Sequence, residues 1–173
     1  EDTTLSANLT IPFGCSLQFM GNAKINLSTY KLTVNGFLHP AQHQIFDTSS
    51  GGSVEFGQYA TSRHISIVWF GADPTGPVDS ATAIQAALDS AYASIGGAGR
   101  LYNAYAPKGI YSFTTLNFKG TASIARPGII GDGISNTHFK QANNANSTGF
   151  EVGGSGASEN VGLVYFEGFT LDG

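Results

Sequence analysis

The acidic side chains have the clearest potential for chemistry in this sequence. Two carboxylates flanking a glycosidic bond act as acid and base, or as acid and nucleophile, in glycoside hydrolysis. Seven acids lie in or beside turn-forming stretches: Asp73, Asp79, Asp132, Glu151, Glu159, Glu167 and Asp172. No spacing among them pairs two carboxylates. We therefore assign no catalytic residue, and expect turn or capping roles for the aspartates and solvated positions for the glutamates.

Histidine and cysteine are the other candidate chemical groups, because both bind metal ions. The histidines are His39, His43, His64 and His138. The first two are four residues apart, but Pro40 disfavours a helical turn between them, and no third ligand is near. Cys15 is the only cysteine, so no intrachain disulfide forms, and a small buried apolar position is expected for it. The sequence predicts no metal and no cofactor.

An aromatic group, Tyr102, Tyr105, Tyr111 and Phe113, admits two interpretations. Such rings stack on sugars in binding sites. The favoured interpretation is that they alternate along the first strand after a helix and pack beneath that helix. Trp69 and Phe70 precede the same helix, and we expect them to anchor its junction with the earlier strands. No carbohydrate-binding residue is assigned from this group.

Several function classes are excluded by motif and charge. The glycines of Gly96-Gly97-Ala98-Gly99 follow a helix, whereas a phosphate cradle precedes one. There is no Gly-x-Ser-x-Gly elbow. The net charge is −4 and the three arginines are scattered, so no basic stripe suits nucleic acid. No apolar run approaches the ~20 residues of a membrane helix, so membrane insertion is not expected.

Composition indicates a strand-rich domain that would position these residues. Of 173 residues, 66 are Gly, Ser, Thr or Asn, and only 12% are charged. Over the first 70 residues, short apolar alternations recur between turn signals, as in an all-β chain. Spacing alone leaves a sandwich and a β-solenoid both open. Asn35-Gly36 stands between two apolar runs and predicts a tight hairpin.

One helix is predicted, from Ser80 to Ser94. Ile84, Ala87, Leu88, Ala91 and Ile95 form one apolar face. Asp79 or Ser80 can cap the N-terminus of this helix, and Gly96-Gly97 can end it.

Short strands are expected again after the helix. Their predicted ranges are 101–105, 113–118, 128–130, 138–141, 150–152 and 161–171, with turns at Pro107-Lys108-Gly109 and Gly131-Asp132-Gly133. The segments Gly128–Gly133 and Gly168–Gly173 have similar patterns 40 residues apart, which hints at a repeat.

The stretch from Ile65 to Phe113 resembles the pectate-lyase-like, right-handed parallel β-helix superfamily. The resemblance rests on Trp69-Phe70-Gly71-Ala72-Asp73, the Ala-rich helix with Asp79 before it, and Pro107-x-Gly109-x-Tyr111. The turn at residues 73–77 departs from the family pattern by an extra proline, and LYNAYAP is a more polar strand than usual. The resemblance covers residues 5–141 and implies an all-β fold. A small N-terminal, virion-proximal β region (1–70) would precede a capping helix and the first coils of a truncated β-helix (71–173), with the helix lying across the first coil.

The N-terminal parts of bacteriophage tailspikes and depolymerases are the most similar family members. This implies a fragment that attaches to the virion tail and supports a homotrimeric β-helix that recognises and degrades a bacterial surface polysaccharide. Its partners would be that polysaccharide and other tail proteins. The catalytic residues would lie in later coils, so we expect the fragment to be inactive alone. A non-catalytic tail assembly module and a fragment of a secreted bacterial polysaccharide lyase or hydrolase are the alternatives. The chain does not begin with Met and ends within a strand pattern, which suggests a longer parent.

Overall fold

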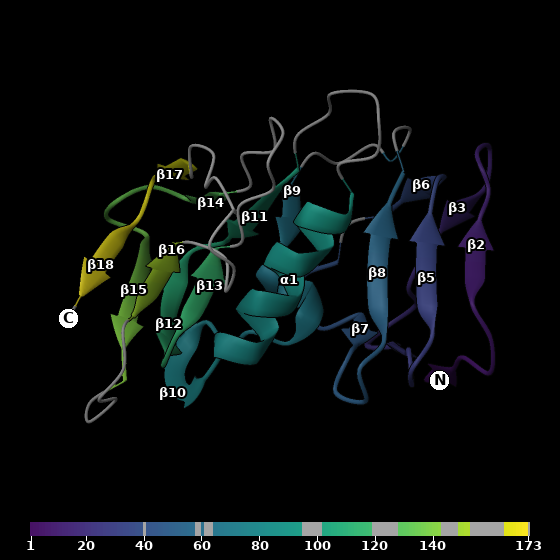
Figure 1. Cartoon of the computed structure of the whole chain (residues 1–173), viewed down its shortest axis with the longest axis horizontal. Coiled ribbons are helices and arrows are strands. Elements are labelled where there is room, and N and C mark those ends of the chain that lie inside the picture. The colour runs from purple at the N-terminus through teal and green to yellow at the C-terminus, as the bar shows by residue number, and fades with distance from the viewer. Residues whose placement is uncertain are drawn as a thin grey trace, which may run out of the picture.

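Short β-strands dominate the computed structural model of the chain (Figure 1). The structure describes residues 1–39, 41–57, 60, 64–94, 102–118, 128–142, 149–152 and 165–172. Within these ranges there is one α-helix, and every pairing between strands is parallel. The all-β prediction is therefore confirmed. No helix in this part of the chain is long and apolar enough to span a bilayer.

The first eight strands form three parallel sheets, ordered β1-β4-β7, β2-β5-β8 and β3-β6. The strands are β1 (Thr3–Thr4), β2 (Leu9–Ile11), β3 (Ser16–Leu17), β4 (Ile25–Asn26), β5 (Lys31–Val34), β6 (Phe37–Leu38), β7 (Phe46–Asp47) and β8 (Ser53–Phe56). Pairing in register places Leu9, Leu32 and Val54 in one row. Leu32 and Val54 are buried, so the alternation seen in the sequence marks inward positions.

The predicted hairpin at Asn35-Gly36 is wrong. β5 lies between β2 and β8, whereas β6 pairs with β3, so the two strands belong to different sheets. A side chain on Gly36 would meet the carbonyl oxygen of Cys15 and lie 2.7 Å from that of Pro12. The Asn-Gly pair therefore turns the chain from one sheet to the next, packed closely against the preceding turn.

The later strands form two four-stranded sheets, β9-β11-β14-β17 and β10-β12-β15-β18, and the pair β13-β16. The strands are β9 (His64–Ser66), β10 (Thr75–Asp79), β11 (Asn103–Ala106), β12 (Gly109–Phe113), β13 (Leu116–Phe118), β14 (Gly128–Gly131), β15 (Thr137–Gln141), β16 (Phe150–Val152), β17 (Tyr165–Glu167) and β18 (Thr170–Asp172). The predicted strand at 113–118 is two strands in two sheets. Residues 101, 161–164 and 173 lie outside the described residues.

Residues 75–77, expected as part of the turn at 73–77, lie instead in strand β10. Thr75 pairs with Ile110 and Asp79 with Ser112, so five residues of β10 face three of β12. This irregularity accommodates Gly76, whose φ is +92°, and the proline that follows it. Gly76 and the proline after it do interrupt the regular backbone, as the sequence indicated. The segment is nevertheless a strand, because β12 lies beside it and pairs with it, and the local sequence does not show this neighbour.

The suggested 40-residue repeat is also wrong in its offset. β14 pairs with β17 with Gly128 beside Tyr165, a separation of 37 residues. Strand β18 pairs instead with β15, with His138 beside Thr170. The two similar segments therefore belong to different sheets, although Gly133 N donates to Gly168 O at 2.7 Å and brings their glycines together.

The helix prediction is confirmed: α1 spans Ala81–Ala93 with Ser80 at its N-cap. Ile84, Ala87, Leu88 and Ala91 are fully buried, and the Asp79 carboxylate accepts a hydrogen bond from Ala81 N. Ile95 and the expected glycine stop at 96–97 lie outside the described residues. The helix contacts β8, the last strand of an earlier sheet, and, less extensively, β13, the first strand of a later one. It lies in the middle of the molecule rather than over one end (Figure 1).

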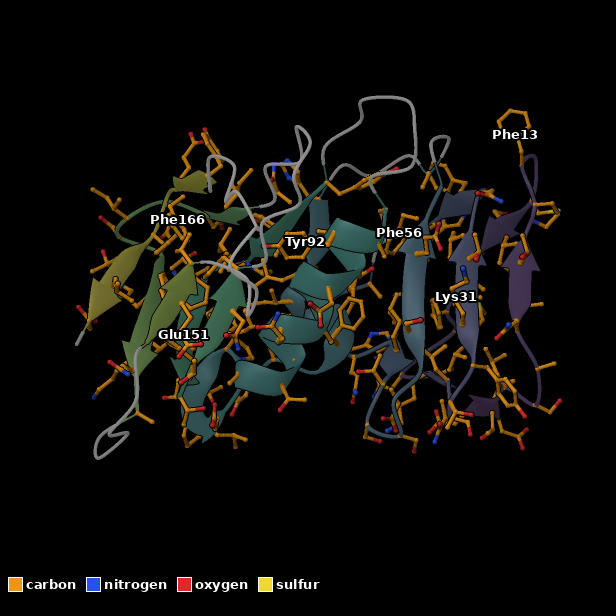
Figure 2. All side chains as sticks on the ribbon, viewed as in Figure 1. Phe13, Lys31, Phe56, Tyr92, Glu151 and Phe166 are labelled. Atoms are coloured by element: carbon orange, nitrogen blue, oxygen red, sulfur yellow. The ribbon has the colours of Figure 1, made fainter. Side chains whose placement is uncertain are left out.

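A short 3-10 helix, η1 (Ile67–Phe70), follows β9 and packs against β7 of the earlier sheets. Trp69 and Phe70 are each 4% exposed. Trp69 Nε1 donates to Ala41 O at 2.7 Å, and the rings of Phe46 and Phe70 lie 5.5 Å apart. The predicted anchoring role of this pair is confirmed. Trp69, Phe70 and Phe46 belong to one continuous hydrophobic core. Phe56 of the same core is labelled in Figure 2.

Candidate functional site

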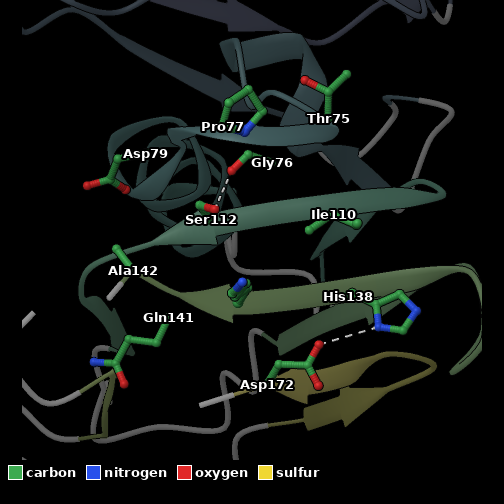
Figure 3. Close-up of a pocket in the computed structure, with 11 residues that line it drawn as sticks. Thr75, Gly76, Pro77, Asp79, Ile110, Ser112, His138, Gln141, Ala142 and Asp172 are labelled. Atoms are coloured by element: carbon green, nitrogen blue, oxygen red, sulfur yellow. Dashed lines mark hydrogen bonds and ion pairs between the residues drawn. The ribbon is translucent and has the colours of Figure 1, made fainter. Parts of the chain in front are cut away.

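The outer face of the sheet β10-β12-β15-β18 carries a groove of about 970 Å³. Register sets its outward side chains in two rows: Thr75, Ile110, His138 and Thr170, then Asp79, Ser112, Lys140 and Asp172. Neighbouring strands stand ~4.8 Å apart, so each row repeats at that spacing. Figure 3 shows the strands crossing the groove in this order. The sheet thus presents hydroxyl, carboxylate and imidazole groups at regular intervals.

Hydrogen bonds and one contact between an imidazole and a carboxylate hold the polar groups of the groove. His138 Nδ1 lies 3.7 Å from Asp172 Oδ2 (Figure 3). Thr114 Oγ1 donates to Asp79 Oδ2 at 3.1 Å, and Ser112 Oγ donates to Gly76 O. Ile110 is 47% exposed and supplies an apolar side chain among these polar groups. This combination suits a hydroxyl-rich ligand that needs donors, acceptors and some apolar contact.

The acids of this groove do not form a hydrolytic pair. Asp79 and Asp172 stand on the two outermost strands, and three strand spacings separate them by about 14 Å. Inverting glycosidases hold their carboxyl groups ~6.5–9.5 Å apart, and retaining ones closer. Asp79 and Asp172 are therefore too far apart to act as such a pair.

The other candidate acids are dispersed. Asp73 Oδ1 accepts from the amide and hydroxyl of Thr75, and these hydrogen bonds hold the pKa of Asp73 below its ordinary value. This confirms the turn role expected for it. Glu151 is exposed on β16, and Glu167 accepts a hydrogen bond from the hydroxyl of Tyr165. Glu159 lies outside the described residues.

A second cavity, of about 590 Å³, lies beside β9, η1 and β11. It is lined by Ala41, Gln42, His64, Ser66, Val68, Trp69, Pro74, Tyr105, Pro107, Lys108, Tyr111 and Asp132. The rings of His64 and Tyr105 stack with centroids 5.8 Å apart, and Tyr105 Oη donates to Asp132 Oδ1 at 3.1 Å. Burial, then this hydrogen bond, raises the pKa of Tyr105, so its hydroxyl keeps its proton.

The aromatic group at 102–113 divides between core and surface. Tyr102, Tyr111 and Phe113 are buried, as the packing interpretation predicts. Tyr105 is only partly buried and faces the second cavity, so that interpretation is wrong for this residue. It occupies an outward position of β11, between the inward Ala104 and Ala106.

No group of three or more His, Cys, Asp or Glu side chains among the described residues is arranged to hold a metal. His39 packs edge-on against Phe37 at 4.8 Å, and His43 Nε2 is buried with no hydrogen-bond partner among the described residues. Pro40 lies outside the described residues. Cys15 is exposed, so the buried position expected for it is wrong. It lies in the turn before β3, where its carbonyl oxygen, rather than its side chain, accepts a bond from Phe37 N.

Sequence reasoning missed the residues that complete the groove, notably Ser112 and Lys140. The alternation in Thr137–Gln141 was the available signal: Thr137 and Phe139 are buried, while His138 and Lys140 face outward. Period-2 patterning shows which residues share a face, but it does not show which strands stand side by side.

No family model, curated protein or solved structure matches this chain.

Proposed function

We propose that this chain is an N-terminal part of a phage tailspike-type protein that binds a bacterial surface polysaccharide. In this proposal, its strands form successive coils of a right-handed parallel β-helix, interrupted by α1. The parent assembles as a homotrimer on the virion tail, contacts other tail proteins there, and carries its degrading activity in further coils.

The groove on β10-β12-β15-β18 is the observation that carries the proposal. The positions of its outward side chains repeat from strand to strand, so the groove is a linear surface rather than a closed pocket. A polysaccharide is also a linear ligand, with hydroxyl groups at regular intervals. Lys140, Asp79 and Asp172 supply charged hydrogen bonds to such groups, and Ile110 provides an apolar contact with a sugar ring.

Two alternatives make different predictions about the groove. A tail assembly module would use its surfaces for proteins and would not bind glycans. A fragment of a secreted bacterial polysaccharide lyase or hydrolase would bind a glycan but would have no virion partner. The tailspike proposal is favoured over the first alternative by the groove, and over the second by the sequence resemblance of residues 5–141.

Calorimetric titration of the chain with a panel of purified capsular and lipopolysaccharide glycans tests the proposal. We expect one class of glycan to bind, and Lys140→Ala combined with Asp172→Asn to weaken binding at least tenfold. Lys31→Ala is the control, because Lys31 lies on a different sheet, where it pairs with Glu55 at 2.9 Å. Glycan binding with equal affinity by both variants would overturn the groove assignment, and no binding to any glycan would favour the assembly module.

A further inference from the structure

The groove on β10-β12-β15-β18 carries charges of both signs. Its lining includes two carboxylates, Asp79 and Asp172, and one ammonium, Lys140. All three side chains are exposed, so a ligand in the groove can contact them. Figure 3 shows the carboxylates on the two outermost strands of the sheet, and Lys140 belongs to β15 between them. The sign of the charge therefore changes from strand to strand across the groove.

The end of the groove at Asp79 is negative. Its carboxylate accepts hydrogen bonds from Ala81 N and Thr114 Oγ1, which are uncharged donors, and no ion pair joins it to a cation of the described residues. Lys140 stands two strand spacings away, about 10 Å, which exceeds the ~8 Å Debye length at physiological salt. The N-terminus of α1 offsets only part of this charge, because it carries about +0.5.

The other end of the groove presents both signs side by side. Lys140 pairs in register with Asp172 on the next strand, about 4.8 Å away, and makes no ion pair with the described residues. His138 Nδ1 lies 3.7 Å from Asp172 Oδ2. An anionic ligand group at this end meets the Asp172 carboxylate, and a cationic group meets the Lys140 ammonium.

A charged polysaccharide that crosses all four strands therefore meets like charges. A polyanion is attracted at Lys140 but is repelled at Asp79 and Asp172, and a polycation is repelled at Lys140. The hydroxyl groups of an uncharged polysaccharide have no such conflict, because each can donate to a carboxylate or accept from an ammonium. Such hydrogen bonds are strengthened by the charge on the protein group.

We propose that the groove takes an uncharged polysaccharide, and that Asp79 and Asp172 exclude acidic ones by repulsion. The proposal rests on the proposed function and names the chemical class of its ligand. Specificity here comes from the unfavourable contacts made by the wrong ligand as well as from the favourable contacts made by the right one.

Calorimetric titration with derivatives of one backbone tests the proposal. Each uncharged glycan of the panel is compared as its hydroxyethyl, carboxymethyl and aminoethyl derivatives, and each acidic glycan with its carboxyl-reduced form. The hydroxyethyl derivative is the matched ligand, because its substituent has a similar size and no charge. We expect the uncharged member of each set that binds to bind about tenfold more tightly than the charged members. Its affinity should change less than about twofold between low and high salt, because screening acts on charged ligands.

Substitution of either groove carboxylate should weaken this discrimination. In Asp172→Asn, the ratio of the affinities for the uncharged and acidic members should fall about threefold or more, because one repulsive charge is lost. Asp79→Asn should act in the same direction, and it retains a side-chain oxygen for Ala81 N. Glu151→Gln is the matched control: it removes one exposed carboxylate from β16, outside the groove, and should leave the ratio unchanged. Circular dichroism checks that each variant is folded.

The outcomes separate this proposal from the proposed function. Tighter binding of an acidic or aminoethyl derivative than of its uncharged counterpart overturns the assignment of ligand class, but the groove still binds a polysaccharide. An unchanged affinity ratio in both aspartate variants also overturns it, because the exclusion then does not come from these carboxylates. An absence of binding to every form overturns the proposed function itself.

Discussion

At the scale of the residue, buried tyrosines combine apolar packing with one satisfied hydroxyl. Tyr102 and Tyr111 are both fully buried, and each donates to a backbone carbonyl, that of Gly57 and that of Pro107 respectively. A buried hydroxyl without a partner would cost about 1–3 kcal/mol, so these carbonyls are part of the packing. Tyr105 differs because its partner, Asp132, is a charged side chain at the surface.

In the Tyr111→Phe variant, the free energy of unfolding is expected to fall less steeply with rising alkaline pH than in the wild type. Burial, helped by nearby Tyr105, Asp132 and Asp73, raises the pKa of Tyr111 above its ordinary value of 10.0. Above about pH 10 the unfolded chain releases a phenolic proton that the folded chain retains, so the free energy of unfolding falls as pH rises. Urea unfolding at pH 8 and pH 10.5 measures this slope. An identical slope in wild type and variant would contradict the assignment.

At the scale of the element, α1 replaces a β-strand at two sheet edges. Ser90 Oγ donates to Val54 O at 2.8 Å, and Ser94 Oγ accepts from Phe56 N at 2.7 Å, which satisfies the edge of β8. On the other side, the Gln85 amide donates to Asn117 O at 3.0 Å and accepts from Asn117 N at 2.8 Å, which satisfies β13. Unpaired edges promote association, so these side chains protect the strands on both sides of the helix.

Ser94→Ala should therefore destabilise the fold more than an ordinary surface change. It leaves the buried Phe56 N without its acceptor, and an unsatisfied buried donor costs about 1–3 kcal/mol. Chemical denaturation measures the loss. Ser135→Ala, at an exposed position, is the control and should change stability by less than ~0.5 kcal/mol. Equal effects of the two substitutions would show that the helix does not protect this edge.

Leu88→Ala tests the apolar face of the same helix. Leu88 is fully buried, and truncation of a buried leucine costs about 2–5 kcal/mol through lost transfer energy and the cavity left behind. The melting temperature should fall by several degrees or more. Val78→Ala, 58% exposed on the preceding strand, should leave it nearly unchanged. An unchanged melting temperature for Leu88→Ala would mean that this face is not packed.

At the scale of the whole molecule, apolar side chains are exposed on the last strands. Val152, Phe166 and Leu171 are 52%, 41% and 53% exposed, on β16, β17 and β18. Among the described strands, each of these three pairs on one side only. Phe166 continues an aromatic row, since its ring stacks on that of Phe150 at 5.4 Å. This surface has the features of a sheet edge that another strand would cover.

The isolated chain is therefore expected to self-associate. Light scattering should show a mass that rises with concentration, and Leu171→Lys should reduce this rise by placing a charge at the edge. Met20→Lys is the control, because Met20 is 76% exposed but lies between β3 and β4, far along the chain from these strands. A sharp monomer at high concentration would contradict the prediction and favour the assembly module.

The chain alone is expected not to degrade capsule, lipopolysaccharide or pectin. Asp79 and Asp172 are about 14 Å apart across the sheet, which is too far for a hydrolytic pair. Reducing-end and unsaturated-sugar assays on these polysaccharides measure the activity. Turnover that is lost in Asp132→Asn or Glu151→Gln would overturn this expectation and would place a catalytic centre within these residues.

Local patterns in the sequence determined the elements whose formation depends on nearby residues. The 3.6-residue period at Ile84, Ala87, Leu88 and Ala91 located α1 and its buried face, because a helix makes its hydrogen bonds within its own segment. Alternation located most strands and separated inward from outward side chains. Asp73 was identified as a turn residue for the same reason, since its carboxylate bonds to Thr75 two positions away.

Tertiary structure alone decided which strands are neighbours, and with them both candidate sites. A strand completes its hydrogen bonds with a partner distant in sequence, so Asn35-Gly36 looked like a hairpin although β5 and β6 belong to different sheets. The same limit applies to function. Lys140 stands beside Ser112 and Asp172, and Tyr105 reaches Asp132, only because parallel pairing brings together residues 27 to 32 positions apart.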